Sequence, residues 1–241
     1  MSDTHAADPI RYHYTFRFAD GSEKRFEVNL DPTTLALIPP ADPAKPDWTE
    51  LGYHQCEQCP LKKEAAHCPV AVNLASLVES FKDTLSHEDI SVTVEAAQRT
   101  YSKQTSLQQG LSSIIGIYMV TSGCPVMDKL RPNVRFHLPF ASGGETIYRA
   151  VSMYLAAQYF RMRRGEAPDW TLEHLAEVYK GVWQVNKGIT QRLAHASNKD
   201  ANVNAVIVLS TFGSSLDDFL EDSLKEIEPL FSSHIKKPAQ P

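Results

Sequence analysis

The stretch YHYTFRFADGSEKRFEVNL, residues 12–30, decides the fold. Apolar and polar residues alternate with a period of two in both of its halves, and the pair Asp20-Gly21 separates the halves. Such alternation on either side of Asp-Gly is typical of a β-hairpin with one apolar face. Because an isolated hairpin is only marginally stable in water, another part of the chain must cover this face. The apolar face carries Tyr14, Phe16, Phe26 and Val28.

The rest of the chain predicts one more strand and a set of helices. Residues 39–47 are rich in proline and form an extended connector, because proline supplies no amide donor to a helix or sheet. Residues 90–96 alternate like a third strand. Apolar residues three and four apart predict helices over 72–81, 107–121, 146–163, 171–183 and 216–231. Residues 203–209 suit a helix or a buried strand, and we favour the helix.

These elements predict an α+β fold with a small antiparallel sheet, made of the N-terminal hairpin and one further strand. Five or six helices pack with it, and the C-terminal part is mostly helical. We interpret residues 1–241 as a single domain. Its parts are the hairpin portion (10–38), the connector (39–47), the cysteine loop with the mainly helical portion (48–235) and a disordered tail (236–241).

Composition limits the class of partner. The 241 residues carry a formal net charge of −5, which argues against a protein dedicated to duplex nucleic acid. The most basic segment, Arg161–Arg164, is short and typical of a solvated helix C-terminus. No window approaches the ~18 consecutive apolar residues of a membrane span, and the polar N-terminus does not resemble a secretory signal. We therefore expect a cytoplasmic protein with no membrane partner, and a protein partner is the class left open.

The four cysteines are the strongest functional signal. Cys56 and Cys59 form a Cys-x2-Cys pair, Cys68 follows in the same loop, and Cys124 comes after a predicted helix end. In a reducing cytoplasm, cysteines are more often ligands or nucleophiles than disulfides. Three of the four immediately precede proline, a pattern that recurs at iron–sulfur ligands. We therefore predict one metal centre ligated by all four thiolates.

Zinc is the metal we expect, because four-thiolate structural zinc sites are common. A four-iron, four-sulfur cluster is the alternative, given the cysteine-proline pattern. Ligation by three cysteines, with His54, His67 or His137 in place of Cys124, also remains open.

A different interpretation makes Cys124 a nucleophile. It lies in a Ser122-Gly123-Cys124 turn, and His137 follows thirteen residues later as a candidate base. Such a thiol needs a lowered pKa and a positioned base, and the sequence fixes neither.

Four short motifs resemble an uncharacterised bacterial family, one of the domains of unknown function. They are Cys56-Glu-Gln-Cys59-Pro-Leu, His67-Cys-Pro-Val-Ala, Thr121-Ser-Gly-Cys-Pro and Phe136-His-Leu-Pro-Phe. The resemblance covers roughly residues 12 to 210. It implies a bacterial source and a single recurring unit, and it supplies no activity and no catalytic residue.

Three functions follow from the sequence. The first is a non-enzymatic, metal-stabilised interaction or regulatory module, in which loss of the metal loosens the fold. The second is an iron–sulfur protein for electron transfer or redox sensing. The third is a thiol-dependent enzyme that uses Cys124. Oligomeric state and substrate are not encoded in any pattern found.

Overall fold

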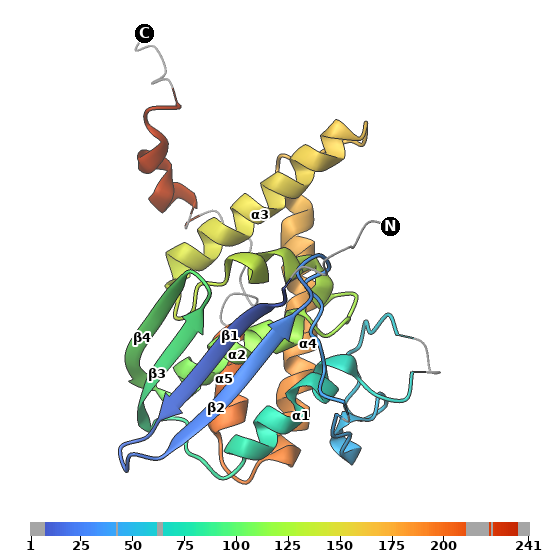
Figure 1. Ribbon diagram of the computed structural model, residues 1–241. Helices are drawn as coiled ribbons and strands as arrows, with labels where there is room; N and C mark the ends of the chain where they lie inside the picture. The colour runs from blue at the N-terminus through green and yellow to red at the C-terminus, as the bar shows by residue number, and fades with distance from the viewer. Residues whose placement is uncertain (1–7, 42, 62–64, 211–221, 223, 236–241) are drawn as a thin grey trace, which may run out of the picture. The chain divides into compact units, whose positions relative to one another are not determined.

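The computed structural model describes residues 8–41, 43–61, 65–210, 222 and 224–235 (Figure 1). Contacts divide the chain into two compact units. The first combines Met1–Phe140 with Gly181–Thr211, and the second combines Ala141–Lys180 with Phe212–Pro241. The units are described separately below.

The predicted hairpin is confirmed. Strand β1 (Ile10–Arg17) pairs antiparallel with β2 (Glu23–Leu30), so that Tyr14 lies opposite Phe26. Gly21 adopts a φ of +84° in the connecting turn, a conformation that glycine reaches without a steric penalty. Three of the four predicted inward residues are fully buried, and Phe26 is partly buried.

The sheet has one strand more than the sequence predicts. Strand β3 (Asp89–Ala96) pairs with β1 as expected, and β4 (Arg99–Ser106) adds to the outer side of β3, giving the order β2-β1-β3-β4. Most β4 residues are exposed on both faces of the sheet. A strand without a buried face shows no apolar alternation, which is why the sequence pattern gives no sign of it.

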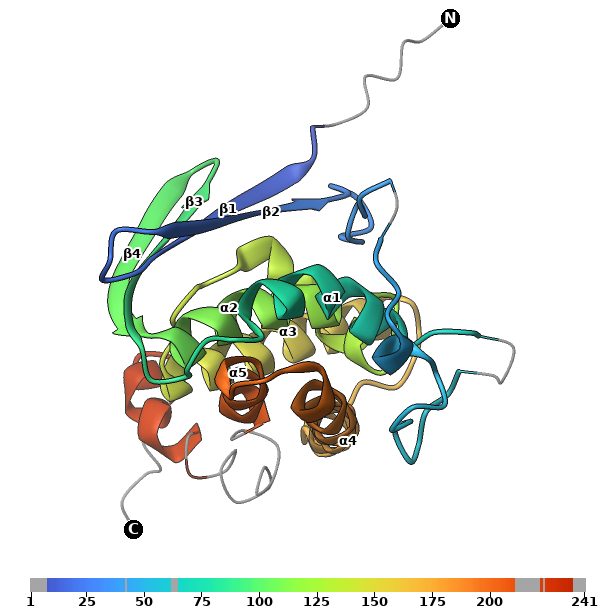
Figure 2. The ribbon, with the colours of Figure 1, turned by 90° about the horizontal axis from the view of Figure 1, so that it is seen from below.

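Two helices cover the apolar face of the sheet (Figure 2). Phe81, at the end of α1 (Pro69–Phe81), contacts the ring of Phe16 edge-on at 5.3 Å between centroids. Helix α2 (Leu107–Val120) approaches the sheet at Gly110, where a Cβ atom would lie 2.7 Å from Val92. Helix α5 (Ala201–Ser210) and the later part of α4 (Glu173–Ala196) lie on the other side of these two helices (Figure 2).

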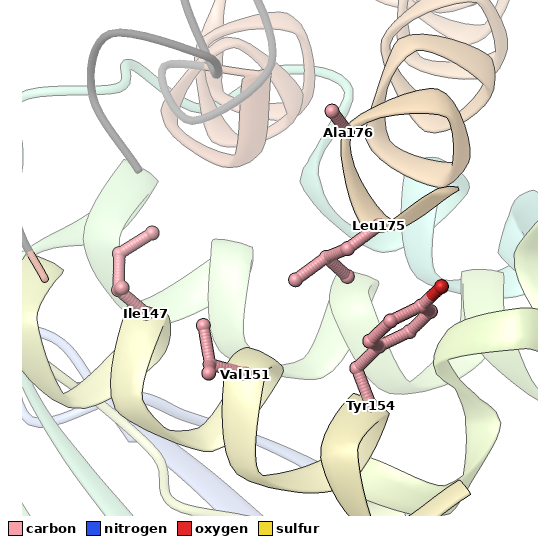
Figure 3. Packing of buried hydrophobic residues seen from close by; sticks show 5 residues of the cluster. All are labelled: Ile147, Val151, Tyr154, Leu175 and Ala176. Atoms are coloured by element: carbon pink, nitrogen blue, oxygen red, sulfur yellow. The ribbon is translucent and has the colours of Figure 1, made fainter. Parts of the chain in front are cut away.

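The second unit is built on α3 (Gly143–Arg163) and the first turns of α4 (Glu173–Ala196). Side chains of the two helices point toward one another (Figure 3). Burying each large apolar side chain in such a cluster contributes about 1.5–3 kcal/mol. The cluster consists of Ile147, Val151, Tyr154, Leu175 and Ala176.

The α+β prediction is confirmed, and 203–209 is helical within α5 (Ala201–Ser210). Short 3-10 segments complete the described elements: η1 (Asp47–Thr49), η2 (Met127–Phe136) and η3 (Glu228–Phe231). The predicted helix over 216–231 falls partly outside the described residues, and the predicted tail 236–241 falls wholly outside them. The single-domain interpretation stays a prediction. Among the described helices, none combines the length and apolar character that crossing a membrane requires.

Candidate functional site

The segment that precedes and carries the first cysteines, residues 48–59, is held against α4 by a buried arginine. Arg192 is only 2% exposed, and its guanidinium donates hydrogen bonds to the carbonyl oxygens of Trp48, Glu50 and Leu51 at 2.6–3.0 Å. A buried cation is tolerated when its donors are satisfied in this way. The guanidinium therefore fixes the entrance to the cysteine loop.

One turn earlier on the same face of α4, Gly188 makes room for Cys56. A Cβ atom at Gly188 would lie 3.1 Å from the Cys56 sulfur and 3.2 Å from the His54 carbonyl oxygen. One turn beyond Arg192, the ring of His195 stacks on that of His54, with centroids 5.2 Å apart. These contacts place the loop against the helix over about two turns.

The four predicted ligands lie in three local structures. Cys56 and Cys59 flank a turn closed by a 3.0 Å hydrogen bond from the Cys59 amide to the Cys56 carbonyl, and both are partly exposed. Cys68 is buried and precedes the first residue of α1, where the following proline starts the helix. Cys124 is buried after α2, and its carbonyl accepts from the Asp128 amide.

The prediction of a metal centre is wrong. Among the described residues, no group of three or more His, Cys, Asp or Glu side chains is placed to hold a metal ion. The sites expected for zinc or for a four-iron, four-sulfur cluster, with Cys56, Cys59, Cys68 and Cys124 as ligands, are therefore not formed. The thiols lie within electrostatic range of one another, but they do not converge on a common centre. Spacing in the sequence brings cysteines into one region and does not fix where their sulfur atoms point.

The thiols of Cys56 and Cys124 are also not prepared for nucleophilic attack. Burial raises the pKa of Cys56 to about 12, and repulsion from the other three thiols adds to the shift. Burial likewise raises the pKa of Cys124, against opposing hydrogen bonds from the Met127 and Val126 amides. A catalytic thiol needs the opposite shift. The alternative function of a thiol-dependent enzyme built on Cys124 therefore finds no support here.

The histidines considered as replacement ligands have other partners. His137 Nε2 lies 2.5 Å from the hydroxyl oxygen of the buried Tyr14 and 3.4 Å from that of Ser113 on α2. His67 Nδ1 lies 2.9 Å from the Thr49 hydroxyl oxygen. These bonds join neighbouring segments of the first unit, so their evident role is structural.

The second unit presents a different kind of surface. Helix α3 buries one face against α4, and its last turns carry large side chains that face solvent: Phe160 is 60% exposed and Tyr159 is 46% exposed. Their rings meet edge-on, with centroids 5.7 Å apart. We call the following set of exposed residues the α3 tip. It consists of Tyr159, Phe160, Met162, Arg163, Arg164 and Trp170.

The chain after α3 is fixed by helix-capping hydrogen bonds. The Glu166 amide donates to the Arg161 carbonyl at 3.0 Å, and the Gly165 amide donates to the Met162 carbonyl at 3.0 Å. This is the Schellman pattern of a helix C-terminus, and it requires the positive φ of +80° found at Gly165. The chain then turns back toward α4 (Figure 1).

Asp169 ties the returning segment to α3. Its amide donates to the side chain of Gln158 at 2.9 Å, and its carboxylate accepts from the Tyr154 hydroxyl at 2.7 Å. The same carboxylate accepts from the amides of Thr171 and His174. The hydrogen bond from Tyr154 is the main reason that the pKa of Asp169 falls well below its usual range. The adjacent Trp170 is therefore held beside the last turns of α3.

The cations of the tip differ in their pairing. Arg161, at its edge, forms an ion pair with Glu166 at 3.0 Å. Neither Arg163 nor Arg164 forms an ion pair within the part of the chain that the structure describes. The tip thus combines exposed aromatic and thioether surface with two available guanidinium groups.

Comparison with known protein families identifies the family to which the chain belongs. A model of a domain of unknown function, DUF6901, matches residues 10–232. The chain belongs to this family. The DUF6901 match spans both units and confirms the resemblance to an uncharacterised family. No curated protein and no solved structure matches the chain.

Sequence reasoning recognised the Arg161–Arg164 segment as a helix end, which the structure confirms. It did not find the α3 tip as a surface. Burial of Tyr154 and Gln158 shows which side of α3 faces α4, and only that orientation turns Phe160 outward. The available signal was the run of aromatic residues next to arginines, with Trp170 across a glycine turn.

Proposed function

We propose that this DUF6901 protein is a non-enzymatic interaction module that docks a protein partner on the α3 tip. One observation carries the proposal: Tyr159 and Phe160 are 46% and 60% exposed, one turn before two arginines, Arg163 and Arg164, that have no ion pairs among the described residues. Exposed apolar patches rimmed by polar groups mark interaction sites.

The residue types of the tip are those enriched at protein interfaces. Aromatic residues, methionine and arginine are over-represented there, whereas lysine, glutamate and aspartate are depleted. Tryptophan, tyrosine and arginine are the commonest residues with large effects on binding. All six residues of the tip belong to these enriched types.

The tip is also prepared for binding before a partner arrives. The hydrogen bonds of Gly165 and Asp169 hold the turn that carries Trp170, and aromatic side chains have few rotatable bonds. Less conformational entropy is then lost when a partner binds, which improves affinity.

Within the described residues, the C-terminal segment contacts the start of α3 and the core cluster. Tyr148, near the beginning of the helix, stacks on Phe231 with centroids 6.5 Å apart, and Leu224 packs on the core cluster. These contacts from the C-terminal segment involve the first part of α3. This contrast between the two ends of α3 supports the proposal that the exposed end binds a partner and does not pack in the core of its own unit.

Site-specific photo-crosslinking tests the proposal in cells of the natural source. A photoreactive phenylalanine analogue replaces Phe160 in one variant and Phe136, which is 77% exposed in the first unit, in the matched control. We expect a discrete protein adduct at 160, competed by excess unlabelled wild-type chain, and no such adduct at 136. Equal labelling at both positions, or no competed adduct at 160, contradicts the proposal.

A cytoplasmic location, expected from the sequence, is part of the same proposal. Fractionation of the cells used for crosslinking tests it, and recovery of the chain outside the cytoplasmic fraction contradicts it.

A further inference from the structure

We infer that the α3 tip recognises an acidic protein segment with an aromatic or aliphatic anchor. This inference rests on the proposed function and adds the chemistry of the partner. Arg163 and Arg164 select carboxylates, and the exposed rings of Tyr159 and Phe160, one turn earlier on the same side of α3, supply the apolar contact.

The charge argument is local. Arg161 is already paired with Glu166, and the Asp169 carboxylate is occupied by its own turn. The cations left at the tip are therefore Arg163 and Arg164. Arginine binds carboxylates through two parallel hydrogen bonds, which are stronger and more directional than those of lysine.

The apolar side chains require that the partner bring more than charge. Tyr159 and Phe160 form an edge-on pair, one turn before Arg163 and Arg164 on the same side of α3. A purely charged segment would leave these groups in water. An aromatic or aliphatic residue in the partner would bury them, at about 25 cal/mol for each Å² removed from water.

Other occupants fit less well. A second copy docking tip to tip would bring two pairs of arginines together, which is unfavourable. Nucleic acids and anionic membranes are extended polyanions that meet the whole molecule, whose net charge is −5. A short acidic segment can contact Arg163 and Arg164 alone, because charges more than about 8 Å away are largely screened at physiological salt.

Selection from a random peptide library on the purified full-length chain tests the partner class. We expect enriched peptides to carry Asp or Glu next to Phe, Trp, Tyr or Leu. The variant R163E/R164E should bind them at least about tenfold more weakly, and F160S should weaken them as well. The matched control is R99E/K103E, which reverses two exposed cations on β4 of the first unit.

Each other outcome overturns the inference. The inference of an acidic partner segment is contradicted if the enriched peptides are neutral or basic. It is also contradicted if they bind R163E/R164E as well as wild type. A library that yields no enrichment contradicts it too. Binding of anionic vesicles or single-stranded RNA that R163E/R164E abolishes assigns the tip to a polyanion instead. If the crosslink at 160 persists in any of these cases, the interaction module survives and only its partner class is wrong.

Discussion

In the cysteine loop, Cys56 packs against α4 and Cys68 is buried by the same chain. At the α3 tip, ordinary residues are turned away from it. Arg192 and Gly188 fit the loop closely to α4, whereas Arg163 and Phe160 have solvent around them. The difference shows that residue type alone does not mark a binding surface. A side chain is available for binding another molecule only where no other part of the same chain already contacts it.

The largest expected effect comes from breaking the anchor of the loop. Arg192→Met leaves three carbonyl oxygens, one of them buried, without their donor, and a lost bond at a buried site costs about 1–3 kcal/mol. We expect the free energy of unfolding to fall by about 3 kcal/mol or more. Urea denaturation of full-length protein measures it, with Arg163→Met as the matched control. A loss no greater than that of the control would show that Arg192 does not anchor the loop.

A smaller effect tests the fit between loop and helix. Gly188→Ala places a methyl group 3.1 Å from the Cys56 sulfur and 3.2 Å from a backbone oxygen, closer than ordinary contact. We expect a loss of about 1–2 kcal/mol in the free energy of unfolding.

Gly116→Ala on α2 is the control for that substitution, because its nearest neighbour is Leu209 at 3.7 Å. The control should gain about 0.5–1 kcal/mol, since alanine is the better helix former. If both glycine variants are stabilised equally in urea denaturation, the loop does not pack on α4 as described.

How far the sequence predicts these two regions depends on the kind of contact involved. Alternation over residues 12–30 predicts the hairpin because one strand face is buried and the other is polar. Strand β4 lacks that contrast, so its pairing with β3 is visible only in the structure. The side of α3 that faces solvent likewise depends on tertiary packing.

The cysteines illustrate the same limit at a candidate site. Cys56 and Cys59 are close in sequence, and the structure closes a turn between them. Ligation depends on the directions of the side chains, and those are set by contacts far away in sequence, such as Gly188 beside Cys56. No local pattern encodes them.

At the tip, the turn after α3 offers a test of intermediate size. Gly165→Ala forces a residue with a Cβ atom into a φ of +80°, at a cost of about 1–2 kcal/mol. We expect this loss in thermal or urea unfolding, together with weaker peptide binding as the last turn of α3, which carries Arg163 and Arg164, loosens. Gly144→Ala, which has open space around its Cβ position, is the control and should show neither change.

Substitutions of exposed residues at the α3 tip should have the smallest effect on stability and the most specific effect on binding. F160S and R163E/R164E change exposed side chains, so each should alter the free energy of unfolding by less than about 0.5 kcal/mol. Circular dichroism during urea unfolding checks this. A loss above about 1 kcal/mol would mean that these side chains serve the fold rather than a partner.

The most direct test compares the two regions in one experiment. The photoreactive residue is placed at Phe160 on the α3 tip and at Gln58, an exposed position in the cysteine loop, in otherwise wild-type chains. The account predicts a competed partner adduct at 160 that R163E/R164E removes, and none at 58. An adduct at 58 with none at 160 would contradict it.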